Sequence, residues 1–281
     1  MRLLVTGSGG MLGVDVVSAA TAAGHDVTAL TRAQLDVTDA AAARAALATA
    51  APAAVINCAA WTDVDGAERA EAAATAVNGA GAGTIAAAAA AAGAFVVHVS
   101  TDYVFAGEAG EPYLEDAPVA PRSAYGRSKL AGERAVAAAA ADCHAIVRTA
   151  WLFGPHGGNF VDTMRRLGDE RDELTVVDDQ LGCPTYTGHL APALVEIAER
   201  RRGGVLHVAG GGSCTWWQLA RATFERTGQL VTVHRGRTAD LGRPAPRPAF
   251  SVLGSTRADA PVLPPWQQGL DAHLAAKEIP A

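Results

Sequence analysis

The chain has 281 residues and a formal net charge of −6, with a pI near 5.7. This length buries a full core and suits one large α/β domain or a domain with a smaller lobe. The acidic balance and scattered arginines exclude the basic footprint of a nucleic-acid-binding protein. The four cysteines lack CxxC spacing, so we interpret them as reduced thiols of a cytoplasmic protein.

The N-terminus has the pattern of a strand, a turn and a helix. An apolar run breaks at Gly7, Gly10 and Gly13, and helical apolar spacing then continues through Val17. Glycines at such a turn let backbone N–H groups approach a pyrophosphate at the helix N-terminus. The spacing differs from GxGxxG, and a plain tight turn is the alternative interpretation.

Apolar strand-like runs alternate with alanine-rich helical runs over the first 150 residues. The expected strands are Leu3–Thr6, Val27–Leu30, Ala54–Asn57, Phe95–Val99 and Ala145–Arg148, and the expected helices lie near 11–23, 39–49, 66–74, 79–92 and 124–141. This alternation predicts an α/β fold with a doubly wound, Rossmann-like parallel sheet. We expect residues 1–150 to form a dinucleotide-binding domain.

Ligands on such sheets bind beyond the carboxyl ends of the strands. The second expected strand ends in Thr31 and Arg32, with no carboxylate where an acid would bind the ribose 2′-OH of NAD. Arg32 suits a 2′-phosphate, which predicts NADPH in preference to NADH, with Asp36 and Val37 lining the adenine. A solvated loop cation is the alternative for Arg32.

The stretch from Ala72 to Thr101 carries no charge and is long enough for a membrane span. Glycines, Asn78 and His98 interrupt it, so it divides better into a helix that ends at Gly93 and a following strand. We expect no transmembrane segment. The glycine turn begins at residue 7, so we also expect no export signal.

Tyr125 and Lys129 stand four residues apart at the start of an alanine-rich helix, which places them on one helix face. A phenol with a pKa near ~10 is a poor acid–base catalyst at neutral pH, and a nearby cation lowers that pKa. We interpret Tyr125 as a proton donor tuned by Lys129. Such pairs also occur by chance in solvated helices, so the interpretation depends on the glycine turn upstream.

After about residue 150 the alternation loosens into loops rich in glycine and proline, with helical stretches near 159–167, 187–202 and 215–227. We expect residues 151–281 to form mainly a substrate-binding lobe, with some segments returning to the sheet. The eight histidines show no ligand spacing, so we assign no metal site.

Together these motifs resemble the extended short-chain dehydrogenase/reductases, and more closely the dTDP-4-dehydrorhamnose reductase family. The resemblance runs from the glycine turn to near residue 255. It is carried by residues 57–68, Ser100–Phe105, Tyr125–Glu133, Arg148–Trp151, Asp179–Thr185, and Arg247-Pro248 with Ser251. The chain departs from the family pattern at Met11, Trp61 and Ala106, and the last two lie nearer the sugar.

The resemblance implies NADPH-dependent reduction of the 4-keto group of dTDP-4-dehydro-L-rhamnose to dTDP-L-rhamnose. It implies that Tyr125 protonates the developing alkoxide, Lys129 holds the nicotinamide ribose, and Thr101 hydrogen-bonds the carbonyl oxygen. The other cofactor-binding residues that it implies are Gly7, Gly10, Met11, Leu12, Gly13, Thr31, Arg32, Asp36, Val37, Cys58, Ala59, Ala60, Asn78 and Ser100. The substrate-binding residues are Val64, Thr101, Asp102, Tyr103, Trp151, Asn159, Gln180 and Arg247.

The implied substrate contacts have structural alternatives. Trp151 is expected to pack on the deoxyhexose, although a tryptophan at a strand end is often core. Arg247 is expected to pair with the dTDP pyrophosphate, although a solvated loop arginine is the alternative. We expect both to converge with Gln180, and Trp216-Trp217 to pack at a helix start.

The implied partner is a dTDP-4-keto-6-deoxyhexose, and NADH is an additional cofactor candidate. We expect neither nucleic acid nor a membrane as a partner, and we leave open a homodimer and a divalent ion. Other functions also stay open: a related dTDP-4-keto-sugar reductase of antibiotic-sugar synthesis such as a dTDP-dihydrostreptose synthase, an extended-type epimerase, and a non-enzymatic nucleotide-binding regulatory subunit. Thr101, Tyr125 and Lys129 together favour catalysis, because a scaffold has no need of a tuned phenol.

Overall fold

The computed structural model describes residues 1–278, and a six-stranded parallel sheet forms its centre. The strand order is β10-β5-β4-β3-β1-β2. The bounds are β1 (Arg2–Thr6), β2 (Asp26–Leu30), β3 (Ala54–Asn57), β4 (Phe95–Thr101), β5 (His144–Thr149) and β10 (Gly204–His207). The inner strands are continuous apolar runs because helices cover both faces of the sheet. The predicted doubly wound fold is confirmed.

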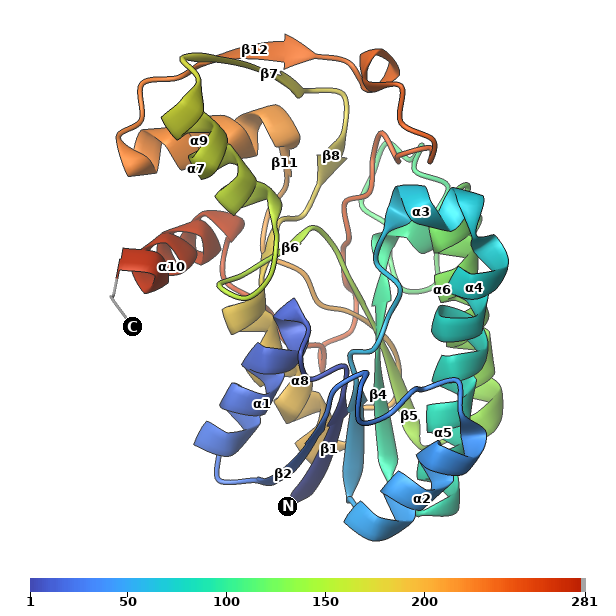
Figure 1. Ribbon diagram of the computed structural model, residues 1–281. Coiled ribbons are helices and arrows are strands. Elements are labelled where there is room, and N and C mark those ends of the chain that lie inside the picture. Colours follow the sequence, from blue (N-terminus) through green and yellow to red (C-terminus); the bar gives the residue numbers. More distant parts are fainter. Residues whose placement is uncertain (279–281) are drawn as a thin grey trace.

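Two helical layers sandwich the sheet (Figure 1). One contains α1 (Met11–Ala22) and α8 (Thr187–Arg200), and the other contains α2 (Ala40–Ala50), α5 (Ala82–Ala91) and α6 (Ala124–Ala140). Successive strand residues point to opposite faces. Leu3 and Val5 therefore pack with α1 and α8, whereas Leu4 packs in the cluster on the other face.

The segment between β3 and α5 differs from the expected pair of helices. It forms two short helices, α3 (Val64–Arg69) and α4 (Glu71–Thr75), which are separated at Ala70. A π-helical turn, η1 (Ala76–Gly81), then leads into α5. A Cβ on Gly81 would lie 2.8 Å from Cγ2 of Val37, so close packing holds this turn in place. Such turns often occur at functional sites.

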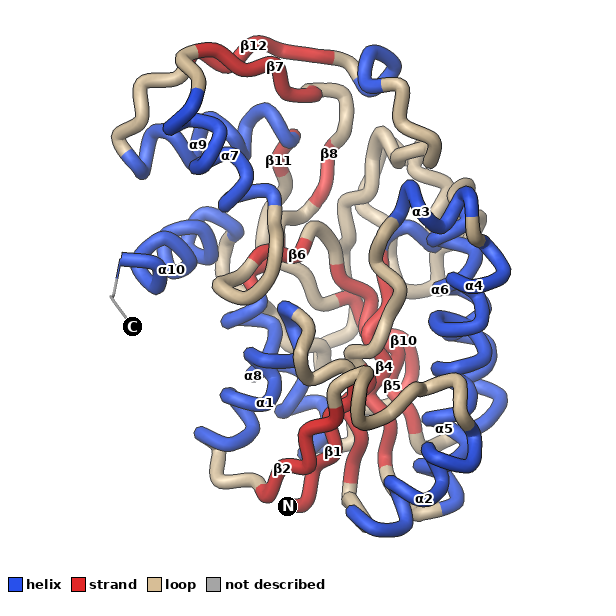
Figure 2. Tube along the Cα trace, viewed as in Figure 1, coloured by secondary structure: helices blue, strands red, loops and turns tan. Residues whose placement is uncertain are grey.

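The later part of the chain builds a lobe beyond the carboxyl edge of the sheet (Figures 1 and 2). Its strands pair in twos: β6 (Leu152–Phe153) with β9 (Thr185–Tyr186), β7 (Glu173–Val177) with β12 (Thr232–Gly236), and β8 (Leu181–Gly182) with β11 (Cys214–Thr215). Its helices are α7 (Phe160–Glu170), α9 (Trp216–Thr227) and α10 (Trp266–Glu278). Short 3₁₀ turns complete the elements, η2 (Asp102–Val104) after β4 and η3 (Thr238–Leu241) after β12.

Helix α10 is not among the helices expected from the sequence. Trp266, Leu270 and Leu274 nevertheless recur at helical spacing, and all three are buried against Phe153 and Leu219. By contrast, α8 and β10 leave the lobe and complete the sheet and its helical layer.

Within residues 1–278, no helix combines the length and apolar character needed to cross a membrane. The uncharged stretch divides as expected, because Gly93 turns the chain at φ +71° between α5 and β4. All four cysteines are free thiols.

A buried ion pair joins α6 to the sheet. Arg148 on β5 donates from Nη2 to Oε2 of Glu133 (2.8 Å) and from Nε to Oε1 (2.9 Å), and each side chain is only 5% exposed. Ser100 on β4 donates from Oγ to the same Oε1 (2.6 Å). The pair therefore fixes the helix that carries Tyr125 and Lys129 to two strands.

Arg148→Met should lower the free energy of unfolding by about 3–5 kcal/mol, because it leaves the Glu133 carboxylate buried without its partner. The control is Arg166→Met, which removes the exposed pair with Glu170 on α7 and should change that free energy by less than about 0.5 kcal/mol. Urea denaturation measures both. Equal effects of the two substitutions would show that the buried pair contributes no more than a surface pair.

Candidate active site

The glycine turn between β1 and α1 has no room for side chains at two of its positions. Gly7 has φ +66°, and a Cβ there would lie 2.6 Å from the Ala59 nitrogen. A Cβ on Gly13 would lie 2.2 Å from the Gly7 carbonyl oxygen. Gly10 precedes α1 without a side-chain cap, so the first N–H groups of Met11, Leu12 and Gly13 point out of the helix end. This turn therefore forms an anion cradle.

The end of β2 lies beside this turn, because Ser8 donates from its backbone nitrogen to the Leu30 carbonyl (3.2 Å). Thr31 donates from both its backbone nitrogen and its hydroxyl to Gln34. Arg32 is exposed and makes no hydrogen bond or ion pair with any residue from 1 to 278. Its guanidinium is thus available to an external anion.

The other residues expected around the adenine are differently placed. The Asp36 carboxylate accepts from the backbone and hydroxyl of Thr38, which lowers its pKa, and the Arg32 charge adds to this effect. Val37 is buried beneath Gly81. Of Asp36 and Val37, therefore, only Asp36 is exposed to solvent.

Asn78 in η1 joins the loop after β3 to α6. Its Oδ1 accepts from the Trp61 nitrogen (2.8 Å), and its Nδ2 donates to the Trp61 carbonyl (3.0 Å) and to Oγ of Ser128 (2.9 Å). The side-chain amide is therefore occupied within the protein, and it holds the loop that contains Cys58, Ala59 and Ala60. Ser100 likewise turns its hydroxyl away from the edge, toward Glu133.

The start of α6 packs directly on the end of β4. Ser123 caps the helix by accepting from the Gly126 nitrogen (3.0 Å), and a Cβ on Gly126 would lie 2.3 Å from the Tyr103 carbonyl oxygen. This contact brings the Tyr125 ring edge-to-face with that of Tyr103, at 5.5 Å between centroids. Thr101, the last residue of β4, lies within hydrogen-bonding reach of the Tyr125 hydroxyl.

Burial raises the pKa of Tyr125 to about 12, the hydrogen bond with Thr101 lowers it in part, and the Asp102 charge raises it further. Lys129 points elsewhere: its Nζ donates to the Val99 carbonyl (2.7 Å), and burial lowers its pKa to about 8. The expectation that Lys129 lowers the pKa of Tyr125 is therefore wrong for this structure, because desolvation dominates. Tyr125 is protonated at neutral pH, which is the form that a proton donor requires.

Asp102 is buried beside these groups, and burial raises the pKa of its carboxyl to about 6. Its Oδ1 accepts from the Thr101 hydroxyl (3.0 Å). The Thr101 proton is therefore directed at Asp102 in this structure. Val64 is the first residue of α3, whose N-cap is Asp63.

Trp151 lies two residues beyond β5 in a strained conformation. Its φ is +48°, which is rare for a bulky residue and typical of functional sites. Its ring stacks on Trp216 at 3.6 Å between centroids with an interplanar angle of 4°, and a Cβ on Gly182 would lie 2.5 Å from its Cε2. The lack of a side chain at Gly182 and the stack together hold the indole in place.

Gln180 completes this aromatic group. Its Oε1 accepts from Nε1 of Trp216 (3.0 Å), and its Nε2 donates to the Thr238 hydroxyl (2.8 Å). Trp151 and Gln180 therefore converge through Trp216. Trp216 begins α9, as expected. From the sequence we assigned it only a packing role, because no local pattern indicates that it stacks on Trp151.

Arg247 lies in the loop that follows η3, and its side chain bonds to Asp65 on α3. Its Nη1 and Nη2 donate to Oδ1 (2.5 Å) and Oδ2 (2.8 Å) of Asp65, whose Oδ1 also accepts from the Ala245 nitrogen (3.1 Å). This bidentate pair clasps the loop of residues 243–247 onto α3. Asn159 also has an internal function, because it caps α7 by accepting from the Asp162 nitrogen (2.9 Å).

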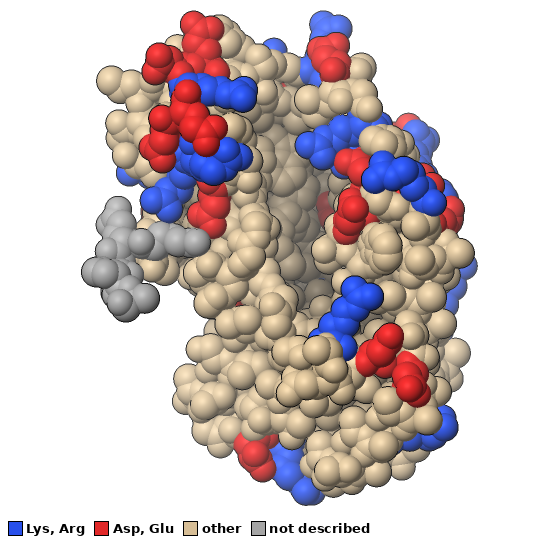
Figure 3. Space-filling view, viewed as in Figure 1, with Lys and Arg blue, Asp and Glu red and all other residues tan. Residues whose placement is uncertain are grey.

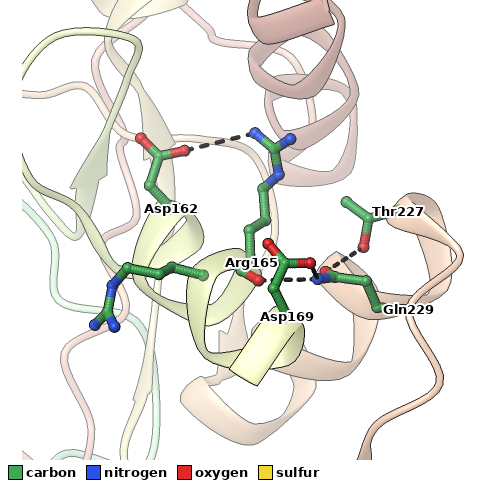
Figure 4. Close-up of a pocket in the computed structure, with 6 residues that line it drawn as sticks. Asp162, Arg165, Asp169, Thr227 and Gln229 are labelled. Atoms are coloured by element: carbon green, nitrogen blue, oxygen red, sulfur yellow. Dashed lines mark hydrogen bonds and ion pairs between the residues drawn. The ribbon is translucent and has the colours of Figure 1, made fainter. Parts of the chain in front are cut away.

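The surface is hollowed between the lobe and the side that carries α3 and α4 (Figure 3). A separate depression of about 390 Å³ lies where α7 meets the end of α9, lined by Asp162, Arg165, Arg166, Asp169, Thr227 and Gln229 (Figure 4). Its polar groups bond to one another: Gln229 donates to the Arg165 carbonyl (2.9 Å) and to Asp169 (2.7 Å). None of the expected catalytic residues lines this depression, so the candidate site is the carboxyl edge of the sheet, where Thr101 ends β4 and Tyr125 stands in the first turn of α6.

The family model for the RmlD substrate binding domain matches residues 1–279. A dTDP-4-dehydrorhamnose reductase of Streptomyces griseus is 47% identical, over 98% of this chain and 93% of the relative. The chain belongs to the dTDP-4-dehydrorhamnose reductase family.

A second relative and a solved structure also resemble this chain. A dTDP-4-keto-6-deoxy-D-glucose reductase of Streptomyces niveus is 44% identical, over 90% of this chain and 84% of the relative. The crystal structure of a Bacillus anthracis dTDP-4-dehydrorhamnose reductase in complex with NADP has a TM-score of 0.95 at 35% identity, over 98% and 99% of the two chains. The resemblance inferred from the motifs is thus confirmed at the level of family and fold.

Asp65→Asn should lower the free energy of unfolding at pH 7 by roughly 1.5–3 kcal/mol, since it removes a charge-assisted pair with Arg247. The arginines hold the pKa of Asp65 well below its usual range. The stabilisation is therefore fully present above the unfolded-state pKa of about 3.9 and is lost as pH falls below it. Denaturation at several pH values should show the difference between wild type and variant shrinking toward pH 3.

The matched control is Arg243→Met, at the exposed arm of the same cluster, for which we expect a change of less than about 0.5 kcal/mol. A difference between wild type and Asp65→Asn that is independent of pH would contradict the carboxylate pair as its cause.

Proposed function

We propose that this protein reduces the 4-keto group of dTDP-4-dehydro-L-rhamnose with NADPH, giving dTDP-L-rhamnose. Membership of the family supports the proposal. The observation that carries it is the placement of Thr101 and Tyr125 together at the carboxyl edge of β4, with Lys129 buried one turn along α6. That arrangement provides a protonated phenol at the hollow where a substrate carbonyl can enter.

The cofactor fits the residues present. The cradle at Gly7 and Gly13, which a Cβ would fill, suits a pyrophosphate, and the unpaired Arg32 suits a 2′-phosphate. The remaining residues that would hold the nucleotide are Gly10, Met11, Leu12, Thr31, Asp36, Cys58, Ala59, Ala60, Tyr125 and Lys129, together with the backbone of Ser100. Val37 and Asn78 would shape the wall rather than contact the nucleotide. When bound, the reduced nicotinamide supplies a hydride.

The protein side chains supply the proton and the positioning. Tyr125, which is protonated at neutral pH, gives its phenolic proton to the oxygen that becomes the alcohol. The Thr101 hydroxyl donates to the same oxygen after turning from Asp102. Lys129 would hold the nicotinamide ribose through its amine.

We also propose how the dTDP-sugar is held. The stacked rings of Trp151 and Trp216 form an apolar wall suited to the C–H faces of a deoxyhexose, with Gln180 fixing the pair. Asp65 does not occupy all five N–H donors of Arg247, and the remaining donors would bind the pyrophosphate. Val64, Asp102 and Tyr103 line the same edge, and Asn159 acts only through the α7 cap.

A related dTDP-4-keto-sugar reductase is the second candidate function. The Streptomyces niveus relative favours it by its name, and the chain departs from the family pattern at Trp61 and Ala106, which the resemblance implies lie nearer the sugar. The two candidates share the residues that supply the proton and differ only in the sugar.

The test is oxidation of NADPH with a small panel of dTDP-4-keto sugars, by wild type and by Tyr125→Phe. Wild type should turn over dTDP-4-dehydro-L-rhamnose best, and the variant should lose about 10²–10⁴-fold in kcat while binding NADPH normally, because only the phenolic proton is removed. Tyr186→Phe in the lobe is the control and should keep full activity. A near-normal kcat in Tyr125→Phe removes this residue from the acid step, and no turnover with any sugar would favour a regulatory subunit.

Cofactor choice is tested with Arg32→Ala. Loss of a guanidinium that pairs with a phosphate should lower kcat/KM for NADPH by roughly tenfold or more and leave kcat/KM for NADH unchanged. Arg44→Ala, an exposed arginine on α2, is the matched control for general charge. The assignment would be wrong if wild type used NADH at least as well and Arg32→Ala changed neither value.

A further inference from the structure

Lysine is rare in this chain, and one of its two lysines is buried at the candidate site. The chain contains only Lys129 and Lys277 among 23 lysines and arginines, and Lys129 is 2% exposed. Arginine stays charged in proteins, whereas a buried lysine can lose its proton. The groups around the Lys129 amine therefore decide which form it takes.

A chain of buried hydrogen bonds runs across β1, β3 and β4 and ends at Lys129. Thr6 on β1 donates from Oγ1 to Oδ1 of Asn57 (2.6 Å), and the Ala59 nitrogen donates to the same oxygen (3.2 Å). Two donors on one atom fix it as the amide oxygen. The amide nitrogen of Asn57 therefore faces Nδ1 of His98, at 3.2 Å.

This contact sets the tautomer of His98. Its Nδ1 accepts from Asn57, so the proton of a neutral imidazole is on Nε2. The ring is fully buried on β4, and burial together with the charge of Lys129 holds the pKa of His98 well below its usual value. The neutral ring therefore directs an N–H at Nζ of Lys129, which lies 3.5 Å from Nε2.

We propose that His98 is a positioning residue that favours the uncharged amine of Lys129. An ammonium has only donors and cannot accept the Nε2–H, whereas the uncharged amine has a lone pair that accepts it. The 3.5 Å separation, longer than the 2.7 Å from Nζ to the Val99 carbonyl, agrees with two opposed donors when Lys129 is charged. Asn57 acts through His98 by holding its tautomer.

Other groups act on the same pair. Glu133, one turn along α6, favours the ammonium, but it shares its charge with Arg148, and the Cys58 thiol beyond β3 adds a weaker pull in the same direction. His144 on β5 acts on His98. Burial lowers the pKa of Lys129 to about 8, near the pH at which an amine both takes and gives a proton. The kinetic consequence rests on the proposed function, because it assumes that Lys129 holds the ribose of a bound cofactor.

The experiment uses the full chain with lysine labelled at 13Cε and 15Nζ and is read by NMR as a function of pH. The two lysines give two signals, and Lys277→Arg assigns them. In wild type the Lys129 signal should titrate at lower pH than that of Lys277. His98→Gln should raise the Lys129 midpoint by roughly one pH unit, because the amide can turn its oxygen toward Nζ. His234→Gln, at an exposed histidine on β12, is the matched control and should leave the midpoint unchanged.

A second measurement reads the tautomer directly in 15N-histidine-labelled wild type, and it does not depend on the variant folding. The proposal requires the proton on Nε2. A proton on Nδ1, or a His98→Gln variant with a native melting temperature and an unchanged Lys129 midpoint, would overturn it. Neither readout uses turnover, so a failed function assay would not be mistaken for a failure of this inference. If the protein is the proposed reductase, the alkaline limb of its pH profile should move with the Lys129 midpoint.

Discussion

Close packing of α6 on the elements beside it is the constraint on which the site depends. A Cβ on Gly132 would lie 2.1 Å from the Asn78 carbonyl oxygen, and one on Gly126 would lie 2.3 Å from that of Tyr103. Larger side chains at these positions would push the helix away. The helix would then lose its contacts with η1 and with the turn after β4, and the phenol and the amine would leave the sheet edge.

The same packing sets the charges of the site. Removal from water favours the neutral form of every titratable group, so it raises the pKa of Tyr125 and lowers that of Lys129. Tyr125 is then protonated at neutral pH, and Lys129 loses its proton more readily than an exposed lysine. The two charged side chains buried nearby, Glu133 and Arg148, form an ion pair that offsets the cost of removing them from water.

The lobe uses a different device to place its aromatic wall. Trp151 adopts a left-handed backbone conformation, which costs of order 1–3 kcal/mol for such a residue. Stacking on Trp216 and contact with Gly182 offset that strain. The wall is therefore assembled from three segments that are remote in sequence: the loop after β5, β8 and the start of α9.

The sequence by itself determined the features that depend on local pattern. Continuous apolar runs predicted the first five strands of the central sheet, glycine spacing predicted the turn before α1, and the motifs around Thr101 and Tyr125 identified the family. The helices α3, α4, η1 and α10 departed from the expected ones, because their boundaries follow from packing against Val37, α6 and the lobe.

The tertiary structure alone decided the pairings. Asp65 with Arg247, Trp151 with Trp216, and His98 with Lys129 join residues that are remote in sequence, so no spacing rule could indicate them. It also decided the direction of the Tyr125 pKa shift. From the sequence, a lysine one turn away predicted a lowering, but desolvation depends on how deeply three-dimensional packing buries the ring, and here it is the larger effect.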